Sequence, residues 1–190
     1  TSGSTASLIG LEAAVESRDS ASMKAALDRL RCAYAIVFGF GGLPLLYMGD
    51  ELGMFNDHSY LQDETKKDDN RWIHRPAMDW KVVKEAQAGN GLAAQVLAQI
   101  KELITTRKSL PSLHASVTSE VFTPSNTAVL VIRRKHAAGA ITQIYNLSEK
   151  TQIIDSTGII KGALKENLSG RTMNFEGAIS IPPYAAWWLS

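Results

Sequence analysis

Apolar residues recur with a helical period between residues 20 and 40. The recurring positions are separated by steps of four and three residues, which places them on one face of a helix. They are Met23, Leu27, Leu30, Tyr34 and Val37. Asp19 or Ser20 can cap the start of this helix and Gly39 can end it, so we expect a helix over about 20–39.

A second helical pattern runs from about Leu92 to Lys108. Its apolar stripe is Leu92, Val96, Leu97, Ile100, Leu103 and Ile104. Arg107 and Lys108 suit the negative end of the helix dipole, and Pro111 stops the helix.

Between the two helical patterns, the run "LPLLYM" over 43–48 is apolar without alternation. Such a run is typical of a strand buried on both faces, as in a parallel sheet covered by helices. We therefore expect one unit of helix, buried strand, long loop and helix, which is too little to close a sheet by itself.

After Pro111 the pattern changes to short apolar segments separated by turns. "TAVLVIRRK" and "GAITQIYNLS" predict two strands joined by a turn around Ala138 and Gly139. "TQIIDS", "GALKENLSG", "AISIPP" and "AAWWLS" follow at short intervals. Several short strands in a short stretch predict a compact antiparallel sandwich that begins near 111–116.

Composition and charge exclude several classes of function. The chain has 190 residues, of which 45% are apolar, so a sizeable core can form. A net charge of +1 with no basic stripe gives no indication of nucleic-acid binding. Cys32 is the one cysteine and lies among helical apolar residues, so we expect a packing thiol in a reducing compartment, and we expect the protein to be cytoplasmic.

No segment is long and apolar enough for a membrane helix, and no signal peptide is visible at the start. The chain lacks an initiating Met and begins within what looks like a folded motif. We therefore expect it to be a fragment of a longer protein.

Two adjacent carboxylates, Asp50 and Glu51, follow the predicted strand. In a β/α barrel this is the edge at which active sites are built. The same pair could simply cap a turn, and position alone favours that structural interpretation. A loop over 54–80 follows, longer than ordinary connections, with four aromatic residues that would suit a sugar surface or simply anchor the loop.

Arg71 lies in this loop within "DDNRWIHRP". Its planar guanidinium can bind a carboxylate bidentately or donate to vicinal hydroxyls, and the alternative is a solvated loop with local ion pairs. His58 and His74 have no partner at metal-ligand spacing, so a metal site is unsupported. "GFGG" precedes a strand instead of following one, and no G-x-S-x-G motif is present.

The segments "GGLPLLYMGDELG" and "DDNRWIHRPAMDW" carry a specific resemblance. The first resembles the eighth-strand segment of family 13 glycoside hydrolases, the α-amylase superfamily. The second is similar to the following loop in amylosucrases and related sucrose hydrolases. The opening "TSGSTASLIGLEAA" and the ending "ISIPPYAAWWLS" are similar to the same enzymes, so the resemblance covers essentially the whole chain.

This resemblance implies α/β plus all-β architecture. Residues 1–111 would be the C-terminal part of a (β/α)8 TIM barrel, namely its seventh helix, eighth strand and last helix. Residues 112–190 would be the C-terminal antiparallel β-sandwich. The strand over 43–48 would then need a cover, either by rearranged helices, by self-association with a second copy, or by the missing N-terminal portion of the parent.

The resemblance also implies a reaction. A carboxylate attacks the glucosyl unit of sucrose while a carboxylic acid protonates the departing fructose, and the glucosyl group passes to an α-1,4-glucan or to water. No cofactor is involved. The family's catalytic carboxylates would all lie upstream, so we expect no catalytic residue in this chain and no activity from it alone.

Arg71 matches the arginine that closes the glucosyl pocket in this family, paired with an aspartate from an early barrel loop. Because that aspartate would also lie upstream, we expect Arg71 to be exposed or mispaired here, in a poorly ordered loop. Gly49, Asp50 and Glu51 would be framework at the barrel rim.

A different class of function is a stand-alone carbohydrate-binding or interaction module carried by the sandwich. Trp187 and Trp188 are adjacent and therefore point to opposite faces of a strand. One of them should be buried, which leaves no evident stacking platform for a sugar.

Overall fold

The computed structural model describes residues 2–190, and this part of the chain divides into two compact units. The first comprises residues up to 30 together with 46–100, and the second comprises 31–45 together with 101–190. The second unit therefore takes in the end of one helix and the end of another, so its limits differ from the sequence boundary between 111 and 112.

The first unit is built from helices and turns. It holds α1 (Thr5–Leu8), α2 (Leu11–Ser17), the beginning of α3 (Ser20–Phe40), α4 (Trp80–Gln87) and most of α5 (Gly91–Ser109). Three 3-10 turns, η1 (Asp50–Leu52), η2 (Ser59–Gln62) and η3 (Asn70–His74), lie in the connection before α4. Leu30, Val96 and Ile100 are buried, as predicted for the apolar stripes of the two long helices, whereas Val37 of the first predicted stripe is 40% exposed.

The prediction of a buried strand over 43–48 is wrong for this structure. These residues form no strand, and Leu43 and Leu45 are 89% and 75% exposed. A strand exists through hydrogen bonds to neighbouring strands. No strand occurs in the described residues of the first unit, so the apolar run has nothing to pair with and the TIM barrel portion is not formed.

The second unit is mainly antiparallel sheet, as predicted for the C-terminal domain. Its strands are β1 (Ser119–Phe122), β2 (Val129–His136), β3 (Gly139–Asn146), β4 (Gln152–Asp155), β5 (Gly162–Lys165), β6 (Thr172–Phe175), β7 (Ala178–Ile181) and β8 (Ala186–Leu189), preceded by η4 (Pro111–Leu113). They form a four-stranded sheet in the order β1-β2-β3-β8 and two pairs, β4-β7 and β5-β6.

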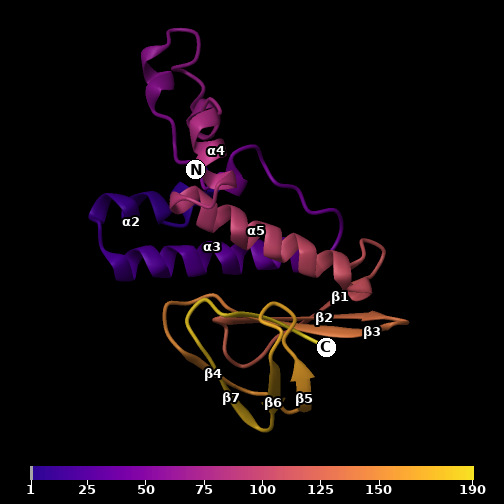
Figure 1. Cartoon of the computed structure of the whole chain (residues 1–190). Coiled ribbons are helices and arrows are strands. Elements are labelled where there is room, and N and C mark those ends of the chain that lie inside the picture. The colour runs from indigo at the N-terminus through magenta and orange to yellow at the C-terminus, as the bar shows by residue number, and fades with distance from the viewer. Residues whose placement is uncertain (1) are drawn as a thin grey trace. The chain divides into compact units, whose positions relative to one another are not determined.

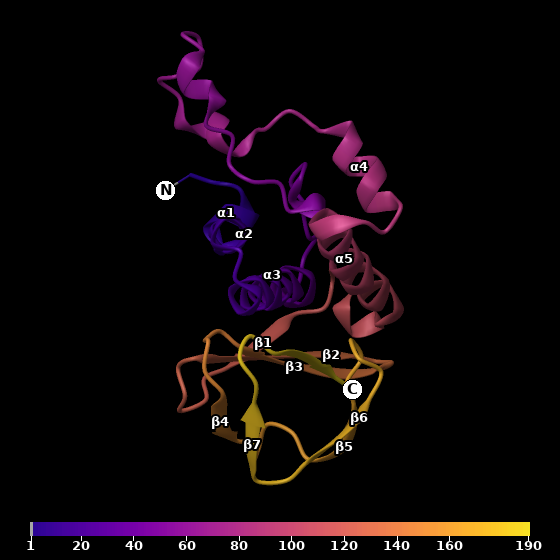
Figure 2. The ribbon, with the colours of Figure 1, turned by 60° about the vertical axis from the view of Figure 1, so that its left-hand side comes forward.

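Figures 1 and 2 both show the larger sheet facing the two strand pairs across a common interior. That interior is a core of apolar side chains from all three sheets. Its buried members include Val131, Ile144, Ile154, Phe175 and Ile181, and Trp187 packs against them. The short strands β1 and β6 were not predicted from sequence, because four residues are too few to establish a pattern.

The other face of the larger sheet is also buried, against residues 31–40 of α3. Tyr145 and Gln143 of β3 and Trp188 of β8 lie on this face, and none of the three is exposed. Gln143 donates its amide N–H to the carbonyl of Gly39 at 2.9 Å, and Trp188 donates its indole N–H to the Tyr145 hydroxyl at 3.0 Å. That hydroxyl lies within reach of both the Ala35 carbonyl and Gln143 Oε1, and its single proton serves one of them.

Two arginines donate hydrogen bonds to carbonyls at the C-terminal end of α3. The guanidinium of Arg134, fully buried, donates to the carbonyls of Gly39, His114 and Val117 at 3.0, 2.6 and 2.7 Å. Arg107 donates to the carbonyls of Phe38 and Gly42. The last carbonyls of a helix have no partner within the helix, so these side chains take the role of a C-cap and suit the negative end of its dipole.

Cys32 is buried in the second unit, beside the carbonyl of Asn146 at 3.7 Å. Burial raises the pKa of its thiol to about 12. The side chain is therefore a packing thiol, as predicted. Among residues 2–190, no helix is both long and apolar enough to span a bilayer.

Candidate functional site

The turn at Gly49, Asp50 and Glu51 is held by its own hydrogen bonds. Gly49 has a φ of +95°, in the left-handed region that glycine tolerates, and an added Cβ would lie 2.7 Å from the sulfur of Met54. The Glu51 carboxylate folds back to accept the Gly49 N–H at 2.9 Å, and the Met54 N–H donates to the Gly49 carbonyl at 3.0 Å. Glu51 is therefore used as a turn cap, which is the structural interpretation of the pair; its place at a barrel rim stays a prediction.

The loop over 54–80 is folded, with η2 and η3 and hydrogen bonds to the start of the chain. Asn56 accepts the Ser4 N–H at 2.8 Å and donates its own N–H to Ser7 Oγ at 3.0 Å. Farther along, the Asp57 N–H donates to the Ile73 carbonyl at 2.8 Å, which closes the loop on itself. The loop is therefore held by hydrogen bonds, whereas a poorly ordered loop was expected from sequence.

Arg71 stands at the beginning of η3 and pairs with Asp69. Its Nε and Nη2 donate to the two carboxylate oxygens of Asp69, each at 2.8 Å, and its side chain is 67% exposed. The hydrogen bond from Arg71 holds the pKa of Asp69 at about 2, below its usual range. The side chain is exposed as expected, but a carboxylate of its own chain holds it, which contradicts the expectation of a mispaired arginine in a poorly ordered loop. Its part in binding a sugar stays a prediction.

The aromatic ring beside Arg71 is enclosed by cations of the same loop. Lys66 Nζ lies 5.0 Å from the centroid of the Trp72 ring, and the guanidinium carbon of Arg75 lies 5.4 Å from it. Both distances suit cation–π attraction. Trp72 therefore serves to fold the loop in this structure.

No group of three or more His, Cys, Asp or Glu side chains in residues 2–190 is placed to hold a metal. His74 packs its ring edge-on against Tyr47, with 5.8 Å between the ring centroids. It also borders a small hollow together with Asp50. Sequence reasoning considered His74 only as a metal ligand and missed this position, since the ring meets Tyr47 through a contact between distant segments.

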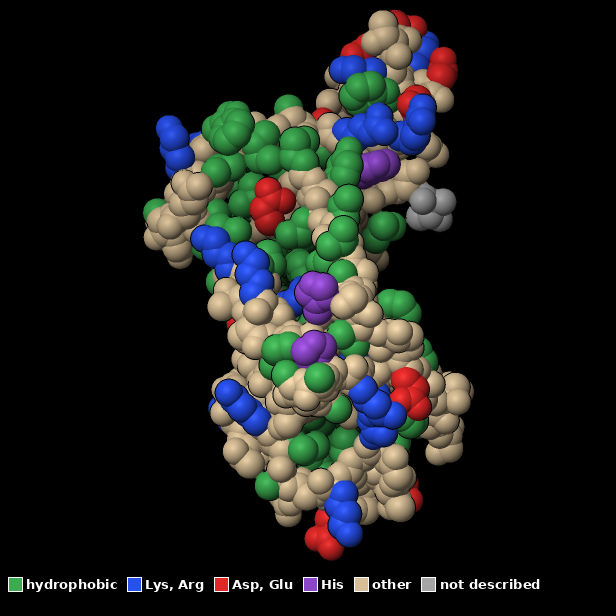
Figure 3. Space-filling view, turned by 90° about the vertical axis from the view of Figure 1, so that its right-hand side faces the viewer, with side chains coloured by type: hydrophobic (Ala, Val, Ile, Leu, Met, Phe, Trp, Pro, Cys, Tyr) green, Lys and Arg blue, Asp and Glu red, His purple; other side chains and the backbone are tan. Residues whose placement is uncertain are grey.

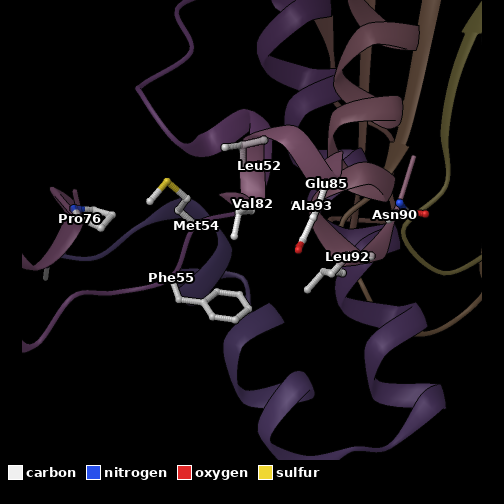
Figure 4. Close-up of a pocket in the computed structure, with 11 residues that line it drawn as sticks. Leu52, Met54, Phe55, Pro76, Val82, Glu85, Asn90, Leu92 and Ala93 are labelled. Carbon is white, nitrogen blue, oxygen red and sulfur yellow. The ribbon is translucent and has the colours of Figure 1, made fainter. Parts of the chain in front are cut away.

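A larger, mainly apolar hollow of about 380 Å³ lies elsewhere in the first unit. In Figure 4, Phe55, Val82 and Leu92 surround it, and the Glu85 carboxylate points toward it from α4. Hydrophobic side chains also gather on the face of this unit seen in Figure 3. Glu85 has one cationic neighbour in the described chain, Lys81 at 3.9 Å.

The comparisons with known proteins agree with the architecture. Residues 119–190 match the family model for the amylosucrase C-terminal domain. The glucosylglycerate phosphorylase of Escherichia coli (strain K12) is 28% identical over an alignment of 183 residues, and the match covers 90% of this chain and 30% of that protein. The chain therefore spans about a third of the length of the relatives it matches.

Two of the solved structures that share the fold serve as examples. AmyP in complex with maltose matches 86% of this chain and 34% of its own, with a TM-score of 0.68 and 17% identity. The α-amylase of Geobacillus thermoleovorans, complexed with acarbose, matches 100% of this chain and 37% of its own, with a TM-score of 0.63 and 17% identity. Residues 119–190 are thus similar to the C-terminal domain of amylosucrase, and the chain as a whole shares the fold of part of the amylase structures.

Proposed function

We propose that this chain is the C-terminal portion of an enzyme that transfers the glucosyl unit of sucrose to an α-1,4-glucan or to water. The observation that carries the proposal is the match of residues 119–190 to the amylosucrase C-terminal domain. The loop after the Gly49–Asp50–Glu51 turn supports it, because it presents the exposed Arg71 that the resemblance relates to sugar binding.

The chemistry would be a retaining double displacement, in which one carboxylate attacks the anomeric carbon and a second carboxyl protonates the departing oxygen. Such a pair of carboxyl groups stands about 5–5.5 Å apart across the bond that is cleaved. In this chain Glu51 is committed to the Gly49 N–H, so the Asp50–Glu51 pair is not arranged for that work. We therefore propose that the chain alone is inactive and that the parent supplies the catalytic carboxylates.

In the parent, the run over 43–48 becomes a barrel strand. Leu43 and Leu45 are exposed here. Neighbouring parallel strands would form hydrogen bonds with their backbone groups, and the covering helices would bury their side chains. A buried strand at this place also brings the turn and the loop with Arg71 to the barrel edge at which active sites are built.

The test is an assay of the parent enzyme and of the 190-residue chain with sucrose, with and without glycogen. We expect fructose release by the parent, together with glucan or free glucose, and none by the chain. Replacing Arg71 by Ala in the parent should raise KM for sucrose, whereas replacing the exposed Lys67 should not. A parent that releases no fructose, or a chain that does, contradicts the proposal.

A second candidate is phosphorolysis, in which phosphate accepts the glucosyl unit and glucose 1-phosphate is released. The observation that favours it is the similarity to glucosylglycerate phosphorylase over 183 residues. The same assay decides: phosphate-dependent formation of glucose 1-phosphate, with glucosylglycerate or sucrose as donor, would replace glucan synthesis as the parent's activity.

The β domain gives little support to a stand-alone carbohydrate-binding module. Trp188 is fully buried beneath α3, and Trp187 packs against Phe175, with 6.1 Å between the ring centroids. Neither ring is left as a platform for stacking a sugar. Strong retention of the whole chain on a glucan affinity gel, lost when Trp187 is replaced by Ala, would favour the module instead.

A further inference from the structure

The turn between α4 and α5 contains an asparagine followed by a glycine. It is formed by Ala88, Gly89 and Asn90, and Gly91 begins α5. Gly89 and Gly91 have φ values of +84° and +78°, which glycine adopts without strain. An added Cβ at either glycine would meet nothing within 4 Å, so the turn is surrounded by open space.

The side chain of Asn90 is exposed, and it makes no hydrogen bond within residues 2–190. Only its backbone is held, because its N–H donates to the carbonyl of Glu85 at 2.9 Å. In Figure 4 the residue lies at the margin of the hollow that Phe55, Val82 and Leu92 surround. The side-chain amide can therefore turn toward the residue that follows it without losing any contact of this kind.

The backbone nitrogen of Gly91 is available as well. As the first residue of α5 it has no acceptor within that helix, and its N–H donates to no other group in the described part of the chain. Glycine has no Cβ to shield this nitrogen or to restrict rotation of the chain beside it. Asn90 is also the only asparagine in the sequence that precedes a glycine. A side-chain amide and an unpaired backbone nitrogen thus stand next to each other in an open turn.

We propose that Asn90 is a site of spontaneous deamidation, in which the Gly91 nitrogen attacks the side-chain carbonyl carbon of Asn90. A C–N bond forms between these two atoms, and the bond from the same carbon to the side-chain nitrogen breaks. That nitrogen leaves as ammonia, with the proton of the Gly91 N–H, and the product is a succinimide. Water then opens the succinimide at the side-chain carbonyl, which gives aspartate, or at the main-chain carbonyl, which gives isoaspartate.

The two products affect α5 differently. Aspartate places a negative charge beside the N-terminus of the helix, where the helix dipole favours it, and lowers the formal net charge of +1 by one unit. Isoaspartate inserts a methylene group into the main chain directly before a helix whose residues Ala94 and Val96 are buried. Isoaspartate should therefore displace the start of α5 and weaken its packing.

The reaction is followed by incubating the 190-residue chain at pH 8 and mapping its tryptic peptides by mass spectrometry. Cleavage after Lys84 and Lys101 gives a peptide, 85–101, in which Asn90 is the only asparagine. We expect this peptide to gain the mass difference between OH and NH2 and to separate into aspartate and isoaspartate forms. Asn70 is exposed too but precedes Arg71, so it should be modified at least about tenfold more slowly.

The same incubation in urea measures what the fold contributes. Because the folded chain leaves both reacting groups unpaired and exposed in a turn, the rate at Asn90 in the folded chain should lie within about tenfold of the rate in urea. A protein in which the turn were held by hydrogen bonds to these groups would instead react much more slowly when folded.

Matched variants locate the site. Asn90→Gln should abolish the modification of peptide 85–101, because the longer side chain would have to close a larger ring. Asn70→Gln should leave the rate at Asn90 unchanged. Neither asparagine is buried, so both variants should fold. Gly91→Ala should also slow the reaction, but alanine is strained at a φ of +78°, so Asn90→Gln is the deciding variant.

Several results would overturn the proposal. An unmodified peptide 85–101 would show that no reaction occurs, and aspartate without isoaspartate would show direct hydrolysis that bypasses the succinimide. Equal rates at Asn90 and Asn70 would remove the role of the glycine. A folded rate more than about tenfold below the rate in urea would show that the fold protects the turn. None of these outcomes depends on whether the parent acts on sucrose.

Discussion

Replacing Gly39 by Ala should destabilise the second unit, although the same change in an ordinary helix is stabilising. Gly39 lies in the last turn of α3, and its φ is not positive, so alanine fits the backbone. Alanine is favoured over glycine in a helix interior by about 1 kcal/mol. An alanine Cβ would lie closer than 3.0 Å to Gln143 Oε1 and to the Tyr145 hydroxyl, which reverses the sign.

The magnitude follows from what must move. Gln143 and Tyr145 are fully buried and hydrogen-bonded to α3 and to Trp188, so neither can turn away without breaking those bonds. Overpacking costs about 1–3 kcal/mol. Loss of two neutral hydrogen bonds adds about 1 kcal/mol each. After the helix gain of about 1 kcal/mol, the net loss of unfolding free energy is about 2–4 kcal/mol.

The assay is urea unfolding followed by circular dichroism and tryptophan fluorescence. The control is Gly39→Ala in a double mutant that carries Gln143→Ala and Tyr145→Phe, because the new Cβ there meets neither obstructing atom. There, Gly39→Ala should be neutral or stabilising. If Gly39→Ala stabilises the unaltered chain, the close approach of β3 to α3 is refuted.

Three further predictions concern buried and charged groups. Arg134→Met leaves buried carbonyls without donors and should lower the free energy of unfolding, measured in urea, by about 3–5 kcal/mol. Lys135→Met removes an exposed ion pair and should lower it by under about 1 kcal/mol. Equal losses in the two variants would count against the capping role of Arg134. The Asp69 carboxyl should show a pKa of about 2 by NMR, and in Arg71→Gln this pKa should return toward 3.8. Because the pKa is lower in the folded than in the unfolded chain, the stability it contributes is present above pH 3.8 and is lost as the pH falls through 2. An unchanged pKa in the variant would disprove the pairing. Native Cys32 should react with a thiol reagent at pH 8 at least about 1000-fold more slowly than in urea, since its pKa rises from 9.0 to about 12; labelling at the unfolded rate would show that it is accessible.

The two long helices could be predicted from sequence, because each apolar stripe repeats over about four turns. The strand over 43–48 could not, because the same apolar run is compatible with a strand only where partner strands exist. β3 was found as a strand, but its two buried faces were not foreseen. Gln143 lies in the middle of β3, and as a polar residue it would be expected to face solvent. It is buried because α3 covers this face of the sheet.

The candidate site was predicted in part. The glycine turn and the local pairing of Arg71 with a preceding aspartate follow from short-range sequence, since each involves neighbours in the chain. The hollow beside Asp50 does not, because its walls come from segments about 20–45 residues apart. Residue spacing alone could not bring His74 next to Tyr47.

The larger sheet packs against a helix on one face and against an apolar core on the other. This arrangement limits which segments can be exchanged between related proteins without loss of packing. The matched family segment begins at residue 119, and it includes Arg134 and Gln143 of the sheet. Both donate to the carbonyl of Gly39, which lies outside that segment. A gene exchange that moved only the strands would leave an arginine and a glutamine facing a foreign helix. Exchange between relatives should therefore succeed where the strands travel together with their helix, and mutations at Gly39 and Gln143 should be accepted mainly as pairs.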